Sequence, residues 1–176
     1  MPPTAEEFAG PTTELLQSLI RNRCVNDGTP DSGDEIRNAE LLTSYLEGAG
    51  LSVEQYESHP GRASIVARIE GSDPSAPTLC LMGHTDVVPV NPDGWSEDPF
   101  GGEVIRAADG TAEVWGRGAI DMLNTTAAMA VAVRRLAEEG FRPRGTLVYF
   151  GVADEEAGGG LGAEYILDRH LSLIHI

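Results

Sequence analysis

The chain has 176 residues, of which 41% are hydrophobic and 23% charged, a composition typical of a globular domain with a sizeable core. Asp and Glu number 28 against 12 Lys and Arg, so the formal net charge is -16. An acidic surface of this kind repels nucleic acids and anionic membranes, and we expect neither as a partner.

The first residues of the chain indicate a cytoplasmic protein. Glu6 and Glu7 stand where a secretory signal would need basic residues, and no apolar stretch follows that could form its hydrophobic part. No segment approaches the length of a transmembrane helix. The two cysteines do not form a metal-binding pair; we expect Cys24 to be a surface thiol and Cys80 to be a small buried hydrophobe.

Two helices are predicted in the first third of the chain. Apolar residues at helical spacing predict a helix that starts near Thr12 or Thr13, because Gly10 and Pro11 interrupt the pattern before it. Residues 32–35 match a capping box, and a one-sided apolar stripe from Ile36 to Leu46 then predicts an amphipathic helix that ends at the glycines of residues 48–50.

The remaining elements alternate between strands and helices. Strands are predicted at residues 51–56, 63–69 and 78–82, followed by a hairpin at 102–116, a buried helix at 122–139, a buried strand at 146–152 and the start of a helix at 161–169. The nearly all-apolar strand at 78–82 is expected in the middle of a sheet that is covered on both faces. This alternation predicts an α/β domain with a mixed, mostly parallel sheet, whose ligand lies beyond the carboxyl ends of the strands.

Three groups of polar residues lie at predicted junctions between strands and helices. His84 and Asp86 lie in GHTDVVP directly after one strand, Asp121 stands at the entry to the buried helix, and Asp154, Glu155 and Glu156 follow the strand at 146–152. Taken one at a time, they fit a strand-end histidine with a turn cap, a helix cap and a solvated acidic loop. Because all three groups fall at what should be one edge of one sheet, a metal site explains them better together.

The types of side chain indicate which metal would bind. One imidazole nitrogen and several carboxylate oxygens, with no thiolate, suit zinc, with manganese or cobalt as alternatives, and two such ions could share a bridging carboxylate. A metal held in this way polarises a carbonyl group and makes a water more acidic, while a free carboxylate beside it accepts the proton of that water.

Three segments of the chain resemble the signature segments of one family of co-catalytic zinc metallopeptidases. They are LMGHTDVVP at residues 81–89, WGRGAIDM at 115–122 and ADEEAG at 153–158. The family includes aminoacylase, acetylornithine deacetylase, succinyl-diaminopimelate desuccinylase and carboxypeptidase G, and the likeness extends over about residues 10–170. It implies a three-layer αβα fold with two divalent metal ions, and hydrolysis of an amide bond in an N-acyl amino acid or small peptide.

The resemblance also implies a role for each site residue. It implies that His84 ligates one metal, Glu156 ligates the second and Asp121 bridges both. Glu155 would then be the general base, and Asp86 would orient the His84 ring. The peptide bond between Asp121 and Met122 is expected to be cis.

The chain departs from the family pattern in two ways. Leu123 and Asn124 stand where many relatives have Lys and Gly, which we interpret as a subfamily difference. A further acidic ligand, a final histidine and a lid and dimerisation domain, through which the full-length protein could form a homodimer, would lie beyond residue 176. We therefore expect residues 1–170 to be the front part of a catalytic domain and this chain alone to be inactive. Residues 171–176 match the translation of a sequencing adapter and are interpreted as a non-native tail.

Two other functions are open at this stage. The chain could be a non-catalytic metal-binding fragment of such an enzyme, which would bind metal without turnover. A magnesium-dependent phosphoryl-transfer enzyme could use the same acids, but the sequence has no phosphate-binding glycine loop with its Lys. The acyl group and side chain that a substrate would carry are not readable from these residues.

Overall fold

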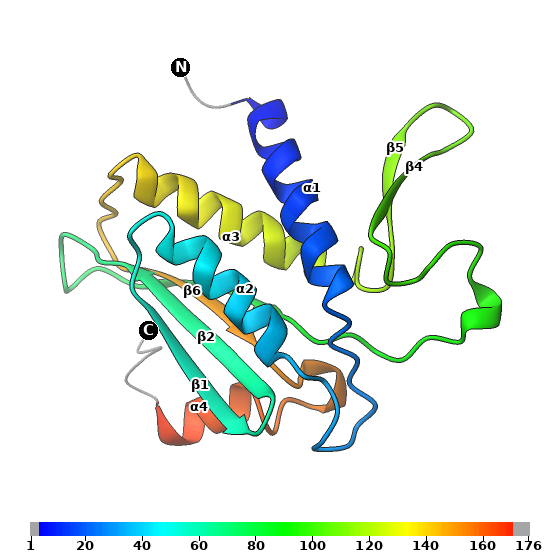
Figure 1. Cartoon of the computed structure of the whole chain (residues 1–176). Coiled ribbons are helices and arrows are strands. Elements are labelled where there is room, and N and C mark those ends of the chain that lie inside the picture. Colours follow the sequence, from blue (N-terminus) through cyan, green and yellow to red (C-terminus); the bar gives the residue numbers. More distant parts are fainter. Residues whose placement is uncertain (1–3, 171–176) are drawn as a thin grey trace.

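The structure, a computed structural model, describes residues 4–170. None of the helices in this part of the chain is long and apolar enough to cross a membrane. In chain order the elements (Figure 1) are α1 (Ala5–Arg21), α2 (Ile36–Glu47), β1 (Val53–His59), β2 (Arg62–Ile69), β3 (Leu79–His84), η1 (Pro92–Gly94), β4 (Glu103–Arg106), β5 (Ala112–Trp115), α3 (Leu123–Glu138), β6 (Leu147–Val152), η2 (Glu155–Ala157) and α4 (Ala163–Arg169).

Four strands form a mixed sheet in the order β1-β2-β6-β3, and the β4–β5 hairpin forms a separate two-stranded sheet. The mixed sheet confirms the prediction, but in the described part only β3 and β6 are parallel, whereas β1–β2 and β2–β6 are antiparallel. For β1 and β2 the reason is the short connection between His59 and Arg62, because a tight turn can join only antiparallel neighbours.

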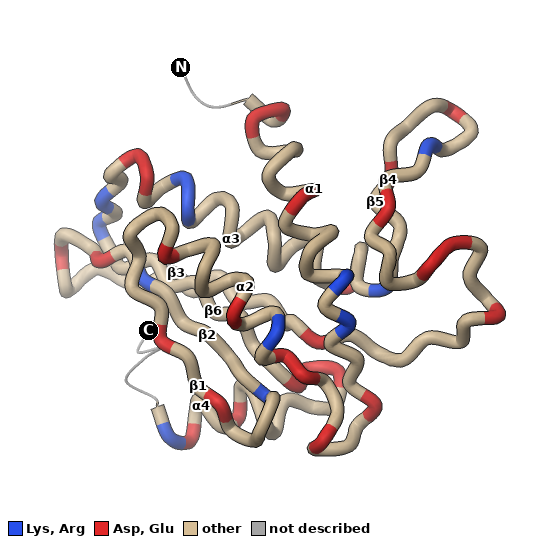
Figure 2. The backbone as a smooth tube through the Cα atoms, viewed as in Figure 1, with Lys and Arg blue, Asp and Glu red and all other residues tan. Residues whose placement is uncertain are grey.

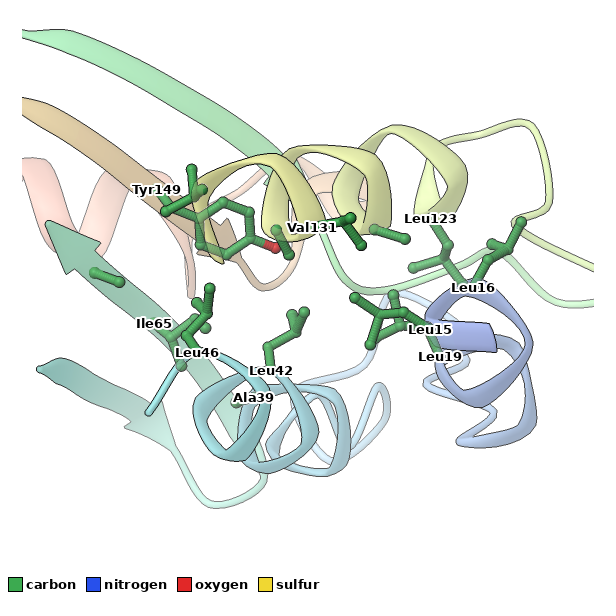
Figure 3. Close-up of a cluster of buried hydrophobic side chains, with 14 of the residues drawn as sticks. Leu15, Leu16, Leu19, Ala39, Leu42, Leu46, Ile65, Leu123, Val131 and Tyr149 are labelled. Carbon is green, nitrogen blue, oxygen red and sulfur yellow. The ribbon is translucent and has the colours of Figure 1, made fainter. Parts of the chain in front are cut away.

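Helices cover both faces of the sheet, so the domain has the expected three layers. On one face, side chains of α1, α2 and α3 meet the inward residues of β2 and β6 (Figure 3) in a cluster that includes Leu19, Leu42, Ile65, Leu123 and Tyr149. On the other face, α4 contributes Ile166 to a smaller cluster with side chains of β2 and β6. Each of these clusters removes apolar surface from water, which is the main stabilising contribution to the fold.

The position of β3 differs from the prediction. It lies at the edge of the described sheet, and its Leu79 and Met82 side chains are 60% and 53% exposed. The fully buried strand is β6, which lies between β2 and β3. Apolar composition shows that a strand belongs to a sheet, but its place in the sheet depends on which other strands pair with it, and sequence composition does not contain that information.

Helix α1 starts at Ala5, so the predicted start near residue 12 is wrong. The Glu7 carboxylate accepts the backbone N–H of Thr4 at 2.7 Å and so stabilises the first turn. Pro11 lies inside the helix. It has no N–H to donate to the preceding turn, yet the helix continues because its apolar face, with Leu16 and Leu19, packs against the rest of the core.

The predicted capping box of α2 is not formed. Glu35 is the N-cap residue without a side-chain cap bond, and the Ser32 hydroxyl donates to the Thr29 carbonyl at 2.8 Å. The Glu35 carboxylate points inward and is fully buried against Arg62. Here a buried ion pair replaces the local cap that the sequence pattern indicated.

The expected environments of the two cysteines are also reversed. Cys24 is buried, although it lies in a polar segment, and Cys80 on the edge strand β3 is only partly buried. The reversal follows from the edge position of β3, which leaves side chains of an apolar strand exposed.

A close approach between β3 and α3 fixes the end of β3. A Cβ atom at Gly83 would lie 2.5 Å from Thr126 Oγ1 and 2.9 Å from Met129 Cε. The same Thr126 hydroxyl donates to the His84 carbonyl at 2.8 Å. Only glycine at residue 83 lets the helix come near enough for this bond.

We predict that Gly83→Ala lowers the free energy of unfolding by about 1–3 kcal/mol, because the added methyl group overpacks the β3–α3 contact. Urea denaturation would measure the change. The matched control is Gly94→Ala in η1, an exposed glycine where a Cβ meets nothing within 4 Å; it should change stability by less than about 0.5 kcal/mol. Equal stability of the Gly83→Ala and wild-type proteins would contradict this account of the contact.

Candidate metal centre

Parallel pairing brings two of the three sequence motifs to the same edge of the sheet. His84, the last residue of β3, is the register partner of Val152, the last residue of β6, and the Thr85 N–H donates to the Val152 carbonyl at 2.9 Å. The chain that leaves β6 then supplies Glu155 and Glu156 in the short turn η2. The carboxyl ends of β3 and β6 therefore lie side by side at one edge of the sheet.

The third motif reaches this place through α3. Asp121 lies two residues before Leu123, the first residue of the helix, and the Thr126 bond to His84 fixes the start of α3 against the end of β3. The peptide bond between Asp121 and Met122 is cis, as the family resemblance implied. The Asp121 side chain is 78% exposed and extends over the edge of the sheet.

The structure brings His84, Asp121 and Glu156 together. Each of them offers one ligand atom, and these atoms all lie within 4.8 Å of one another. His84 Nε2 is 3.2 Å from Asp121 Oδ1 and 3.7 Å from an oxygen of Glu155. The four side chains that the sequence predicted to converge therefore do so, with Asp121 and Glu155 as exposed members of the cluster.

The orientation of the His84 ring is set by its other nitrogen. Nδ1 lies 2.9 Å from the main-chain carbonyl oxygen of Asp86 and 3.6 Å from its carboxylate. Because a carbonyl oxygen only accepts, Nδ1 carries a hydrogen, so that in the neutral ring the lone pair of Nε2 faces the cluster. Asp86 thus holds the ring chiefly through its backbone.

The carboxylate of Asp86 has a different set of partners. It is fully buried and accepts the backbone N–H groups of Glu155 at 3.2 Å and Glu156 at 3.1 Å. The Asn26 side-chain amide donates to it at 2.8 Å. One buried carboxylate therefore links the His84 segment to the turn that carries both glutamates.

The local charges favour a bound cation. Burial raises the pKa of Glu156, and the neighbouring charges of Asp121, Asp86 and Glu155 raise it further against the opposing effect of His84. Burial alone would lower the pKa of His84, but the Asp86 carbonyl and the surrounding carboxylates outweigh it and the pKa is raised. Carboxylates so close together repel one another unless a cation or proton lies between them.

The donor set fits a divalent metal of the zinc type. One imidazole nitrogen and two carboxylate oxygens are the ligands that catalytic zinc sites use, and no cysteine lies among them. The Asp86 carbonyl on the far ring nitrogen supplies the usual support for a ligating histidine.

A hollow of about 580 Å³ borders the cluster at Asp121. Its walls include Trp95 and Trp115, whose rings meet edge to face with centroids 5.9 Å apart, and the Arg117 guanidinium lies 5.5 Å above the Trp95 ring. This volume is in the range of small-molecule sites.

Several polar residues behind the cluster were not recognised from the sequence. Asn26, Glu35 and Arg62 were assigned no role at the site, and Asp154 was noted only as one of three consecutive acids. An arginine at the start of the mostly apolar strand RASIVARI was the signal that could have indicated a buried ion pair. Of the histidines without an assigned role, His59 pairs with Asp31, and His170 packs beside Tyr56. His175 and the proposed tail at 171–176 lie outside the described residues.

Comparison with known sequences identifies a matching family and similar proteins. The model of the family described as Peptidase family M20/M25/M40 matches residues 80–175. Aminoacylase-1 of Mus musculus is 36% identical over 93% of this chain and 38% of its own length. Carboxypeptidase S of Saccharomyces cerevisiae is 44% identical over 89% of this chain and 28% of its own length. The chain thus spans less than two-fifths of these relatives.

Solved structures share the fold. Human carnosine dipeptidase 1 has a TM-score of 0.67 and 24% identity, over 96% of this chain and 37% of that one. An M20 family metallo-carboxypeptidase from Sulfolobus solfataricus has a TM-score of 0.68 and 19% identity, over 95% of this chain and 35% of that one.

We predict that residues 1–176 bind zinc weakly and hydrolyse little or no amide substrate. The family resemblance assigns each of two metals only two ligands from this chain, whereas catalytic zinc sites normally have three protein ligands. Asp121→Asn should abolish the binding, and Asp168→Asn on the exposed side of α4 should leave it unchanged. Calorimetric titration with zinc would measure both; tight binding that survives Asp121→Asn would contradict the assignment.

Proposed function

The chain belongs to peptidase family M20/M25/M40, and on that premise we propose that it is the front part of a metal-dependent hydrolase that cleaves the amide bond of an N-acyl amino acid or small peptide. The observation that carries the proposal is the group of His84, Asp121 and Glu156, which meets Glu155 beside an open hollow. The names aminoacylase, desuccinylase and carboxypeptidase of its relatives support it, because each describes cleavage of an amide bond.

We propose that His84 and Glu156 each hold one of two divalent metal ions and that Asp121 bridges them, with zinc as the metal and cobalt or manganese as alternatives. When bound, such ions supply Lewis-acid chemistry: they polarise the substrate carbonyl and make a nearby water more acidic. The support from this chain is chemical, since nitrogen and carboxylate donors converge where negative charge is otherwise uncompensated.

Glu155 is proposed as the general base. Its side chain is 59% exposed, and an oxygen of its carboxylate lies 3.7 Å from His84 Nε2, so it is open to water beside the cluster. A carboxylate in this place can accept a proton from water and later return it to the leaving amine. Asp86 would position both His84 and Glu155. Its carbonyl oxygen holds the His84 ring, and its carboxylate accepts the Glu155 backbone N–H.

The hollow beside Asp121 is proposed as the place where part of the substrate lies. Two tryptophan rings offer a large apolar surface, and the cationic Arg117 lies against one of them. The proposal extends to a cytoplasmic enzyme that could form a homodimer in its full length.

In the complete enzyme we expect Glu155→Gln to retain zinc and to lose about 10²–10⁴ in kcat, the usual contribution of a general base. Asp121→Asn should lose zinc and activity together, because the shared ligand is weakened. Metal analysis and a steady-state assay with N-acyl amino acids and dipeptides would separate the two roles. If Glu155→Gln removed the metals, the roles of base and ligand would have to be exchanged.

Trp95→Ala in the complete enzyme should raise KM on the order of tenfold and change kcat much less, because it removes an aromatic wall of the hollow without touching the metal ligands. The control is Phe141→Ala, which removes an exposed aromatic ring that belongs neither to the ligand group nor to the lining of the hollow. Steady-state kinetics on one substrate would measure both. An unchanged KM in Trp95→Ala would place the substrate elsewhere.

A further inference from the structure

A set of buried charged side chains lies directly behind the turn that carries Glu155 and Glu156. Arg62 and Glu35 are fully buried and Asp154 is almost so. Arg62 donates to both oxygens of Glu35, at 2.7 and 2.8 Å, and also to Asp154 Oδ1 at 2.7 Å. None of the three belongs to the proposed ligand set.

These carboxylates hold the backbone of the turn. Three consecutive N–H groups and that of Leu161 donate to oxygens of buried carboxylates, which include Asp86. The bonds are Asp154 N–H to Glu35 at 3.1 Å, Glu155 N–H and Glu156 N–H to Asp86 at 3.2 and 3.1 Å, and Leu161 N–H to Asp154 at 2.8 Å. Hydrogen bonds to charged acceptors are stronger than neutral ones, so the turn has little freedom to rotate.

Asp154 is the point at which the chain changes direction. Its φ angle is +65°, in the left-handed region that non-glycine residues rarely adopt. Its carboxylate accepts bonds from Arg62, from the Asn26 amide at 3.2 Å and from the Leu161 N–H. These three bonds keep the residue in this conformation, which sends Glu155 and Glu156 toward His84 instead of along the line of β6.

We propose that Asp154, held by Arg62, is a positioning residue that sets the direction of the Glu155–Glu156 pair. It touches neither substrate nor metal and acts only through the backbone of the two glutamates. The inference rests on the proposed metal-dependent hydrolysis for its functional consequence, but the restraint of the turn is a property of the chain itself.

Two substitutions at Asp154 distinguish the effect of its left-handed backbone angle from the effect of its side-chain hydrogen bonds. Asp154→Gly permits the left-handed angle freely but removes all three accepted bonds. Asp154→Asn also tolerates that angle and keeps one oxygen for Arg62, but it offers an NH₂ group to the Leu161 N–H. Asp34→Gly is the matched control, because Asp34 also has a positive φ angle of 52° and pairs with an arginine, yet its side chain is exposed.

In the complete enzyme, Asp154→Gly should weaken zinc binding by about 10- to 100-fold, the usual effect of removing a partner that orients ligands. The kcat value should fall while KM stays within about twofold, because Glu155 is displaced and the hollow is intact. Asp154→Asn should recover part of both losses, and Asp34→Gly should match the wild type. Chelator competition and steady-state kinetics would give these values.

Amide hydrogen exchange on residues 1–176 without metal tests the restraint independently of catalysis. Asp154→Asn should speed exchange at residues 154–161 and leave β6 protected. Faster exchange throughout β6 would indicate a general structural role and overturn the proposal, as would wild-type zinc affinity and kcat in Asp154→Gly. If the wild-type enzyme neither bound zinc nor cleaved amides while exchange changed as expected, the proposed function would fail and the restraint would stand.

Discussion

Parallel pairing between β3 and β6 sets His84 opposite Val152, and the geometry of the whole site follows from that register. A slip of one residue would turn the His84 side chain to the other face of the sheet, away from the turn that follows β6. Gly83 protects this register indirectly, because it lets α3 approach until Thr126 bonds to the His84 carbonyl. The same contact fixes the start of α3, and with it Asp121.

The chain that surrounds this pair of strands carries many acidic side chains and few basic ones. Acidic residues are spread along much of the backbone (Figure 2), and among residues 4–170 Arg62 is the one arginine that is fully buried. The buried carboxylates of Glu35 and Asp154 share this guanidinium, and that of Asp86 is held instead by the Asn26 amide. All three carboxylates also accept backbone N–H groups. Burial of charge is favourable only with such partners, so the turn that bears the two glutamates is rigid.

The surface beside the site is partly apolar and open. The edge of β3 is apolar and exposed, the hollow at Asp121 is open, and the chain spans less than two-fifths of mouse aminoacylase-1. Under the proposed function, residues 1–176 supply the base and three metal ligands, while further ligands and substrate contacts belong to the complete enzyme. Recognition of the acyl group would then be separate from the positioning that this chain performs.

The sequence by itself determined the elements with strong periodicity, among them α2, α3 and β6, and its three motifs predicted which side chains would meet. Those motifs lie at strand and helix ends, where local pattern and position in the sheet are directly linked. Only the tertiary structure decided the edge position of β3, the start of α1 before Pro11 and the partner of Glu35. These features depend on contacts between distant segments: Glu35 matched a capping pattern, but burial beside Arg62 gave its charge a stronger partner than a helix end.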